Sequence, residues 1–227
     1  MKDLRGYSTS YILRIAKYEV NYRFAIIDMI GSSRNGGVAV ISKLWEILDE
    51  KDLFRHEPWI QVSTQTVRLP DGRIVEDYLQ FALPNFAVMV AQIADGRIIC
   101  ERSYKHGARR LLLTLPGGMV EPGETALAGA QRELLEETGY VSDEWRFLGQ
   151  RVMNANAGGN AANIFVARNC RQVAEPNPGD LEEITIELMT PGELLEAFMK
   201  GEMPLGCDSV ALLPAIFELG IVRVNCS

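Results

Sequence analysis

Two short turn sequences in the middle of the chain predict consecutive β-hairpins. Pro-Asp-Gly occupies positions 70–72 and Asp-Gly occupies positions 95–96, each between two runs rich in β-branched and aromatic residues. The runs are residues 59–69 and 73–83 for the first turn, and 86–94 and 97–104 for the second. A glycine after aspartate supplies the positive φ that a tight turn requires. A chain that begins its core with two hairpins must build a sheet, and later helices must pack against that sheet.

The next segment predicts a strand, a tight loop and a capped helix. Residues 111–115 (LLLTL) are typical of a short buried strand that runs into Gly117 and Gly118. Residues 125–138 predict a helix, because Thr125 can cap its N-terminus and Gly139 suits the position after its C-terminus. The apolar positions of this helix are Leu127, Ala130, Leu134 and Leu135.

The last third of the chain continues the mixture of strands and helices. Residues 145–153 and 163–168 predict strands around a polar loop, and residues 183–189 predict another strand. Thr190 and Glu193 form a capping box with proline between them, which predicts a helix start. A final helix is expected over about 208–219, with Pro214 as a kink. The element order indicates an α/β domain with a mixed sheet, preceded by an N-terminal hairpin layer.

The N-terminal part of the chain fits two periodicities. Residues 18–26 alternate between larger apolar and more polar side chains, which favours a strand, although an apolar stripe over 11–26 also fits a helix. We expect a helix over 9–17 and a strand over 18–27. The sequence GSSRNGG at 31–37 predicts a turn or a linker and is the best candidate for a boundary. We divide the chain into an N-terminal extension of uncertain structure, 1–57, and a main domain, 58–227, that includes the first hairpin.

Composition argues against several classes of function. The 227 residues carry a formal net charge of −7, which disfavours a general nucleic-acid or anionic-membrane binder. The four cysteines form no CxxC pair and the chain has two histidines, so free thiols in a reducing cytoplasm are expected rather than a zinc site. The apolar stretch 11–30 is interrupted by charged residues and is too polar to span a membrane.

Three glutamates are concentrated at the end of the 125–138 helix. Glu133 and Glu137 are four residues apart, and Glu136 lies one turn from Glu133, so their like charges repel. Glu136 and Glu137 also occupy the last turn, where the helix dipole disfavours negative charge. A solvated acidic face is one interpretation. The other interpretation is a functional site, because two rules of helix stability are broken together. Carboxylates at this spacing can bind a divalent cation, and Mg²⁺ is favoured over Ca²⁺ because the sequence has no EF-hand pattern.

The residues around these glutamates resemble a known pattern. From Gly118, five residues lead to Glu124, seven more lead to Arg132 and Glu133, and Glu136 and Glu137 precede Thr138 and Gly139. This spacing resembles the Nudix box of the Nudix hydrolase superfamily. Only the last aliphatic position departs, since it holds Tyr140. The resemblance implies a Nudix α/β/α sandwich that hydrolyses a nucleoside diphosphate linked to another moiety and that uses Mg²⁺ or Mn²⁺.

The same resemblance implies roles for individual residues. Glu133 and Glu137 would be the principal metal ligands, Glu136 a direct or water-mediated one, and the carbonyl of Gly117 a further one. Arg132 would orient the glutamates through salt bridges. The structural residues of the box would be Gly118, which allows the tight turn, Glu124, which braces the loop, and Gly139.

From about residue 45 to residue 219 the chain resembles the ADP-ribose and ADP-sugar pyrophosphatase branch of that superfamily. The shared stretches are the Pro-Asp-Gly hairpin after EPWIQV, the segment ERSYKHG (101–107) and LPGGMVEPGE, with SVALLPAIFEL fitting more loosely. The branch implies a homodimer whose subunits share an adenine site. Trp59 or Tyr78 would stack on the adenine, or else pack within the sheet. Lys105, Arg109 and Arg110 would meet phosphates, or else remain solvated surface bases.

Two features leave the mechanism and the substrate open. The branch commonly takes its general base from a loop before a late strand, where Glu182 and Glu183 fall, and Glu182 is slightly favoured. The loop 154–163 lacks the proline-bearing motif usual in ADP-ribose hydrolases. The loop contains four asparagines, whose side-chain amides either bind a sugar or base or form turns. They are Asn154, Asn156, Asn160 and Asn163.

These observations predict a Mg²⁺- or Mn²⁺-dependent enzyme that hydrolyses the pyrophosphate bond of an ADP-sugar, ADP-ribose first, to AMP and a sugar phosphate. The expected partner is a small nucleotide sugar, with neither nucleic acid nor membrane involved. The alternatives are a hydrolase of another nucleoside diphosphate sugar or of a dinucleotide, and a non-catalytic Nudix domain that senses a nucleotide. The complete set of glutamates favours an enzyme, because a sensor need not keep metal ligands.

Overall fold

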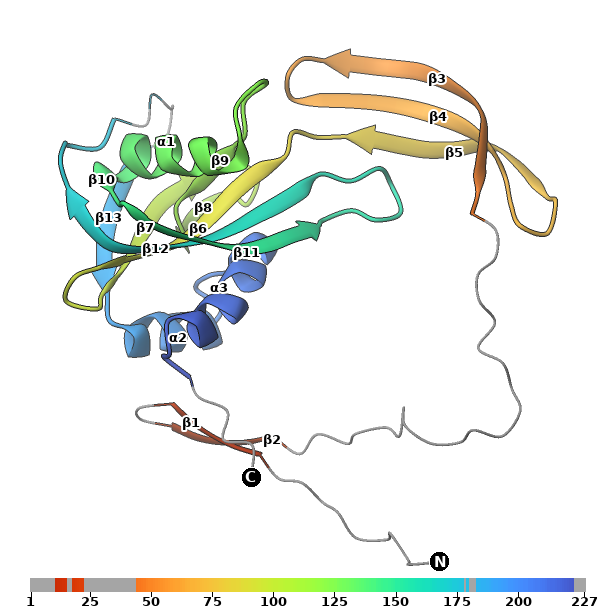
Figure 1. The fold of residues 1–227 in the computed structure, drawn as a ribbon. Coiled ribbons are helices and arrows are strands. Elements are labelled where there is room, and N and C mark those ends of the chain that lie inside the picture. The colour runs from red at the N-terminus through yellow and green to blue at the C-terminus, as the bar shows by residue number, and fades with distance from the viewer. Residues whose placement is uncertain (1–10, 16–17, 23–43, 178, 180–182, 223–227) are drawn as a thin grey trace, which may run out of the picture.

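The structure is a computed structural model that describes residues 11–15, 18–22, 44–177, 179 and 183–222 (Figure 1). Its strands are β1 (Tyr11–Ile15), β2 (Tyr18–Tyr22), β3 (Glu46–His56), β4 (Ile60–Arg68), β5 (Ile74–Ala82), β6 (Phe86–Ile93), β7 (Ile98–Lys105), β8 (Arg110–Thr114), β9 (Gly117–Met119), β10 (Tyr140–Val141), β11 (Glu144–Val152), β12 (Ala161–Gln172) and β13 (Ile184–Met189). Its helices are α1 (Ala126–Thr138), α2 (Pro191–Met199) and α3 (Gly206–Glu218).

The main sheet is mixed, as the order of elements predicted. Its central path is β10-β12-β6-β7-β13, with β11 on β12, β8 on β7 and β9 on β6. Strands β6 and β12 pair in parallel, and the other pairs are antiparallel. Helix α1 covers one face of the sheet, and α2 and α3 cover the other (Figure 1). The predicted α/β/α sandwich is therefore confirmed.

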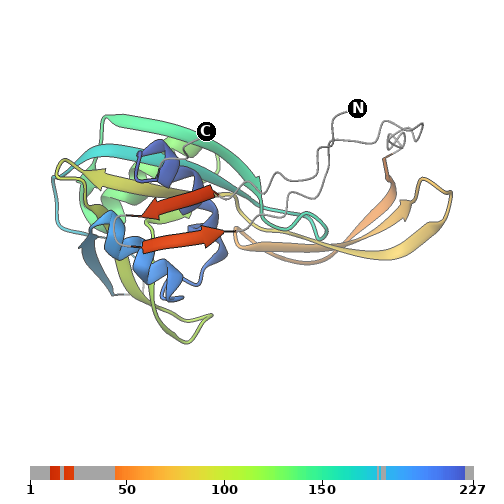
Figure 2. The same cartoon turned by 90° about the horizontal axis from the view of Figure 1, so that it is seen from below.

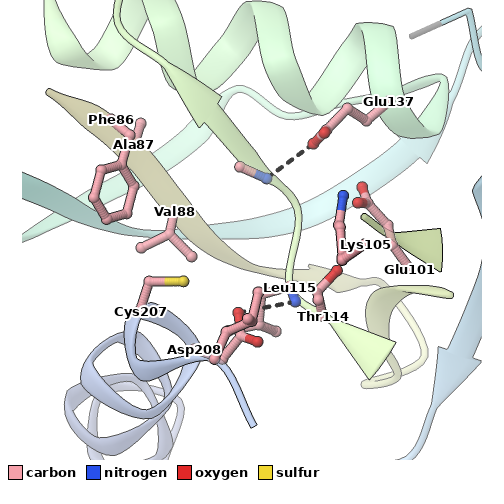
Figure 3. A pocket seen from close by; sticks show the side chains of 12 residues that line it. Phe86, Ala87, Val88, Glu101, Lys105, Thr114, Leu115, Glu137, Cys207 and Asp208 are labelled. Atoms are coloured by element: carbon pink, nitrogen blue, oxygen red, sulfur yellow. Dashed lines mark hydrogen bonds between the residues drawn. The ribbon is translucent and has the colours of Figure 1, made fainter. Parts of the chain in front are cut away.

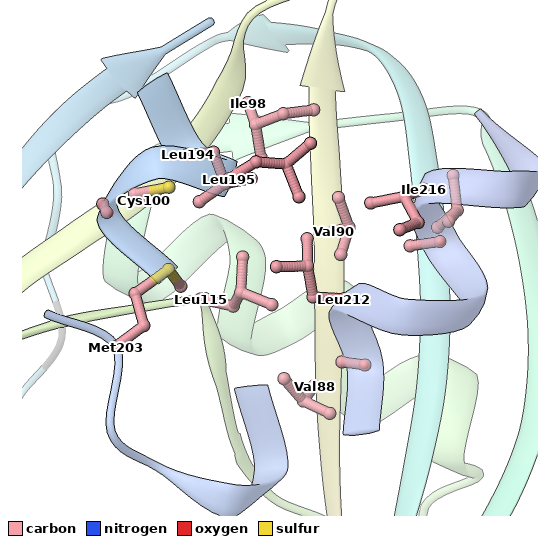
Figure 4. Packing of buried hydrophobic residues seen from close by; sticks show 14 of the residues in the cluster. Val88, Val90, Ile98, Cys100, Leu115, Leu194, Leu195, Met203, Leu212 and Ile216 are labelled. Atoms are coloured by element: carbon pink, nitrogen blue, oxygen red, sulfur yellow. The ribbon is translucent and has the colours of Figure 1, made fainter. Parts of the chain in front are cut away.

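Strand β6 shows why the sheet needs helices on both faces. All of its residues except Gln92 are apolar, and alternate side chains point to opposite faces. Ala87 and Met89 pack in a cluster with Leu134 of α1. Val88 and Val90 pack in a second cluster with residues of α2 and α3 (Figure 4). Each helix layer thus buries the β6 side chains that point to its own face of the sheet.

A separate antiparallel sheet precedes the sandwich, with strand order β3-β4-β5. The predicted turn at 70–72 joins β4 to β5, and Gly72 has the expected positive φ of 89°. Strand β3 pairs with β4 from Glu46 opposite Arg68 to His56 opposite Ile60. The boundary expected between residues 57 and 58 thus lies in the connection of this β3–β4 hairpin.

The helix predicted over 9–17 is wrong within the described residues. Residues 11–15 form β1, which pairs antiparallel with β2 from Tyr11 opposite Tyr22 to Ile15 opposite Tyr18 (Figure 2). The apolar spacing of this segment fits either period, and cross-strand pairing decides between them because it satisfies the backbone of both segments at once. The strand predicted over 18–27 is confirmed at 18–22, and its remainder lies outside the described residues.

The predicted helix ends are confirmed. In α1 the Thr125 hydroxyl accepts a hydrogen bond from the Ala128 N–H, and Gly139 is left-handed with φ of 75°. Thr190 and Glu193 form the complete capping box at the start of α2. No described helix is long and apolar enough to cross a membrane.

Candidate functional site

The site begins where strand β9 runs against the end of α1. Gly117 and Gly118 place the backbone of β9 between β6 and the glutamates of α1. A Cβ atom on Gly118 would lie 2.3 Å from the carboxyl carbon of Glu133, and one on Gly117 would lie 2.5 Å from the Ala87 carbonyl oxygen. Both positions require glycine because neighbouring groups already fill that space.

Arg132 connects the loop and the glutamates. Its Nη1 donates to Glu133 Oε1 at 2.9 Å and to Glu136 Oε2 at 3.0 Å. Its Nη2 donates to Glu124 Oε1 at 2.9 Å and to the Met119 carbonyl at 2.8 Å. The hydrogen bond from Arg132 lowers the pKa of Glu124, and these carboxylates raise the pKa of Arg132. One guanidinium therefore holds the loop, the start of α1 and its acidic end together.

Glu133 and Glu137 are the more buried carboxylates of the helix end. Burial raises the pKa of Glu133, against the lowering effect of its hydrogen bond with Arg132. Glu137 Oε2 accepts a hydrogen bond from the Gly117 N–H at 2.9 Å. Burial nevertheless raises the pKa of Glu137 to about 7, because desolvation outweighs that bond. Glu136 keeps 44% of its side-chain surface exposed.

These groups fit a hard divalent cation in chemistry. They offer carboxylate oxygens and nearby backbone carbonyls, which are ligands that Mg²⁺ and Mn²⁺ accept. Across the described ranges, no three carboxylate, imidazole or thiol side chains already converge to hold an ion. Arg132 draws Glu133 and Glu136 toward itself, while Glu137 turns to the Gly117 N–H. A bound cation would therefore compete with Arg132 for the same oxygens.

A cavity of about 70 Å³ lies behind Glu137 (Figure 3). Glu101 of β7 and Asp208 of α3 line it, each with 1% of its surface exposed, together with Lys105. Burial raises the pKa of Glu101 well above its ordinary range and that of Asp208 to about 7, while Lys105 lowers both. The Leu115 N–H donates to Asp208 Oδ1 at 3.2 Å.

Sequence reasoning missed Glu101 and Asp208. A signal for Glu101 was present, because this charged residue directly follows three apolar residues in a strand that was predicted correctly. Asp208 gave no comparable signal, since the first turn of a helix is an ordinary place for aspartate.

The other predicted site residues are spread over several elements. Lys105 lies in the cavity beside Glu137, and its backbone pairs with Arg110 at the start of β8. Arg109 has a positive φ of 54° in the exposed turn between β7 and β8. Glu183 is exposed and directly precedes β13, whereas Glu182 lies outside the described residues. The structure thus brings Lys105, but not Glu183, against the glutamates.

The aromatic candidates lie on the three-stranded sheet. Trp59 is 60% exposed in the turn between β3 and β4. The Tyr78 hydroxyl donates to the Asn156 carbonyl at 2.7 Å, and its ring meets Trp45 edge-on with centroids 5.3 Å apart. An opening of about 280 Å³ reaches from Pro58 and Gln61 to Met119 beside the glutamates. It connects the three-stranded sheet with the end of β9 and the loop that precedes α1.

The asparagine-rich loop joins the two sheets. The Phe81 N–H of β5 donates to the Ala157 carbonyl at 2.8 Å, and Gly158 forms a parallel bridge with Phe81. Most of the asparagine amides bond within the protein: Asn154 donates to Asn160, Asn160 to the Pro84 carbonyl, and Asn163 to the Phe86 carbonyl. These three side chains are thus engaged within the protein, and Asn163 belongs to β12 rather than to the loop.

Comparison with known families and proteins agrees with this geometry. The NUDIX domain model matches residues 83–205, and the nucleoside diphosphate sugar hydrolase N-terminal domain model matches residues 45–78. ADP compounds hydrolase NudE of Escherichia coli (strain K12) is 30% identical over 112 residues, which cover 48% of this chain and 60% of that protein. This chain therefore aligns with less than two thirds of that relative.

Two further similarities extend over more of the chain. ADP-ribose pyrophosphatase of Bacillus subtilis (strain 168) is 24% identical over 146 residues, which cover 63% of this chain and 78% of that protein. A crystal structure of an ADP compounds hydrolase superposes with a TM-score of 0.70 at 20% identity, covering 78% of this chain and 95% of the other. At that identity the superposition establishes the shared fold.

Proposed function

Because this chain belongs to the Nudix family, we propose that it is a metal-dependent pyrophosphatase that hydrolyses an ADP-sugar, ADP-ribose first, to AMP and a sugar phosphate. The observation that carries the proposal is the acidic end of α1, where the absence of a side chain on Gly118 leaves room for the Glu133 carboxylate. A stable helix end does not need three glutamates and a glycine fitted to one of them. The relatives named for ADP compounds and ADP-ribose support an adenine nucleotide as substrate.

In this proposal Mg²⁺ or Mn²⁺ is held by Glu133, Glu136, Glu137 and the Gly117 carbonyl. Such an ion neutralises phosphate oxygens and makes an attacking water more acidic. Arg132 keeps Glu133 and Glu136 on the same side of α1 by bonding both. The Gly117 N–H donates to Glu137 and orients its carboxylate toward β9. Glu182 or Glu183 would accept the proton of the attacking water, with Glu182 favoured.

The substrate contacts follow from the opening beside Met119. Lys105 and Arg109 would meet the phosphates, since both lie near the β7–β8 connection that precedes the metal loop. The nucleoside would extend through the opening toward the three-stranded sheet, where the exposed ring of Trp59 can stack on a base. The side chain of Asn156 would read the sugar or base, while its carbonyl is engaged by Tyr78. We also propose a homodimer built on the three-stranded sheet.

A substrate panel tests the activity. Purified protein with Mg²⁺ or Mn²⁺ should release AMP from ADP-ribose or another ADP-sugar, and chelation by EDTA should stop the release. Glu137→Gln should reduce turnover by a factor of about 10³ or more with an unchanged far-ultraviolet circular dichroism spectrum. Binding of nucleotide sugars without metal-dependent release of AMP would instead support the sensing domain and contradict the enzyme.

A further inference from the structure

Three buried side-chain oxygens in the described residues have no hydrogen-bond partner. They are Glu101 Oε1, Ser103 Oγ and Asp208 Oδ2. Two of the three belong to carboxylates that line the same cavity behind Glu137 (Figure 3). An unpartnered carboxylate oxygen is costly to bury, so its presence points to an absent ligand.

Glu101 occupies a position where an apolar residue would be expected. It lies in the middle of β7, paired with Thr114 of β8 on one side and Ile186 of β13 on the other. Cys100 beside it is fully buried, and Ile99, two residues earlier and on the same face of the strand, packs in the core beneath α1. Fold stability alone would favour another aliphatic side chain at this position.

The Glu101 side chain reaches toward α1. Its carboxyl group is within hydrogen-bonding reach of the Glu137 carboxyl group. Two ionised carboxylates repel at such a distance, so the pair needs either a shared proton or a cation. Among the described residues that line the cavity, Lys105 brings one positive charge against the three carboxylates of Glu101, Glu137 and Asp208. The cavity therefore keeps an excess of negative charge when all three are ionised.

We propose that Glu101 is an additional ligand of the divalent cation that Glu137 holds, and that it binds this cation from strand β7. The inference rests on the proposed function, since it takes Glu137 to be a metal ligand. It assigns the unpartnered Oε1 to the metal and explains why a carboxylate is buried in a strand of the core. Asp208 serves a different purpose, because its Oδ1 accepts the Leu115 N–H and anchors α3 to the strand before the metal loop.

Binding of Mn²⁺ to the metal-free full chain, without nucleotide, tests the assignment. Free Mn²⁺ is followed by electron paramagnetic resonance, and bound water is counted by spin-echo measurements in oxygen-17 water. Glu101→Gln should weaken Mn²⁺ binding at least about tenfold and add one water ligand to the bound ion. Asp208→Asn, from the same cavity, should change the affinity by less than about threefold and leave the water count unchanged.

Each outcome decides a separate point. Wild-type protein that binds no Mn²⁺ contradicts the metal site of the proposed function itself. Normal affinity in Glu101→Gln overturns the ligand assignment and leaves the proposed function intact. Weaker binding with an unchanged water count also overturns it, because Glu101 would then only support Glu137. If Glu101→Gln does not fold, Glu101→Asp replaces it, with an intermediate affinity expected and wild-type affinity contradicting the assignment.

Discussion

Gly117 and Gly118 of β9 exclude a side chain for different physical reasons. At Gly117 a Cβ atom would meet backbone, the Ala87 carbonyl oxygen at 2.5 Å. At Gly118 it would meet the far end of a flexible side chain, the Glu133 carboxylate. Backbone inside a sheet cannot give way cheaply, whereas a carboxylate can rotate. Gly117 is therefore needed for the fold, and Gly118 is needed for the position of the Glu133 carboxylate.

This difference predicts opposite results for two matched substitutions. Gly117→Ala should lower the free energy of unfolding by about 1–3 kcal/mol, because the strand pair β6–β9 must shift. Gly118→Ala should change it by less than about 1 kcal/mol but reduce AMP release at least about tenfold, because Glu133 is displaced. Urea denaturation and turnover measure the two effects. Gly107→Ala is the control, since nothing lies within 4 Å of a Cβ atom there.

The raised pKa of Asp208 predicts how the free energy of unfolding depends on pH. Its pKa rises to about 7 in the folded chain, mainly through burial, so folding favours the protonated form. The stabilising contribution of that proton is fully present below pH 3.8 and is lost as the pH rises through about 7. In EDTA, the unfolding free energy of the wild type should therefore fall between pH 5 and pH 8. Lys105 faces the same cavity, and Glu101 and Glu137, whose pKa values are also raised by burial, contribute to the same fall.

Asp208→Asn isolates the contribution of this residue. The asparagine keeps an oxygen for the Leu115 N–H but cannot ionise, so the fall between pH 5 and pH 8 should be smaller by up to about 3 kcal/mol. Urea denaturation at the two pH values gives the difference. An equally steep fall in wild type and Asp208→Asn would contradict the assignment.

Sequence reasoning reached the residues of the site unevenly. The spacing from Gly118 to Gly139 identified the loop, the helix and the partners of Arg132, because all of them are local in the chain. Glu101 and Asp208 reach the cavity behind Glu137 from strand β7 and helix α3. Their burial depends on how these distant elements pack, which local periodicity does not encode.

At the scale of elements, α1 ends with its charges arranged unfavourably. Its last turn contains no basic residue, while Glu136 and Glu137 lie beside the negative end of the helix dipole. Arg132 offsets part of this charge from one turn earlier. A divalent cation at this end would stabilise the folded chain, because it would be attracted both to the negative end of the helix dipole and to the glutamate carboxylates.

Metal addition should therefore raise the melting temperature. At free Mg²⁺ one hundred times Kd, the folded state gains about 2.7 kcal/mol, and each kcal/mol corresponds to about 2–4 °C in a domain of this size. Scanning calorimetry with and without EDTA measures the shift. The double variant Glu133→Gln, Glu137→Gln should show almost none of it. A full shift in that variant would place the cation elsewhere.

The elements with strong local signals were predicted, and those with weak or ambiguous local patterns were not. The two predicted hairpins have turns with a glycine at positive φ, and α1 and α2 begin at the predicted capping residues. Strand β3 was not predicted, since all of its residues are exposed and no alternation marks a buried face. Residues 11–15 were expected to be helical because their apolar spacing fits both periods.

At the scale of the whole molecule, the asparagine-rich loop holds the three-stranded sheet against the sandwich. Tyr78 and Phe81 of β5 both bond to backbone carbonyls of this loop. A Cβ atom on Gly158 would lie 2.1 Å from the Phe81 carbonyl oxygen. The absence of a side chain at Gly158 therefore allows the two sheets to connect.

Gly158→Ala should loosen that connection. Gly72→Ala is the matched control, because both glycines have φ near +90° but nothing lies within 4 Å of a Cβ atom on Gly72. The control should lose about 1 kcal/mol of stability, and Gly158→Ala about 1–3 kcal/mol more. Hydrogen exchange at the Phe81 amide should accelerate only in Gly158→Ala. Equal effects in the two variants would mean that the loop does not hold the sheets together.

Within the described part of the chain, the three-stranded sheet also exposes apolar side chains. Strand β3 forms its edge, and among its exposed side chains are Ile47 at 57% and Phe54 at 55%. A long edge strand that exposes apolar side chains can pair with another chain. We infer that a second copy covers this sheet in the proposed homodimer.

Sedimentation velocity should therefore show a dimer of the wild-type chain. The double variant Ile47→Lys, Phe54→Lys should raise the dimer Kd about a hundredfold or more, because buried lysines leave unpaired charge in the interface. Leu213→Lys, an equally exposed leucine of α3 on the sandwich, should leave the dimer intact. If the subunits share the adenine site, the double variant also loses affinity for ADP-ribose while Mn²⁺ binding at α1 persists. A wild-type monomer at all concentrations, or a dimer that survives both lysines, would place the subunit contact elsewhere or remove it.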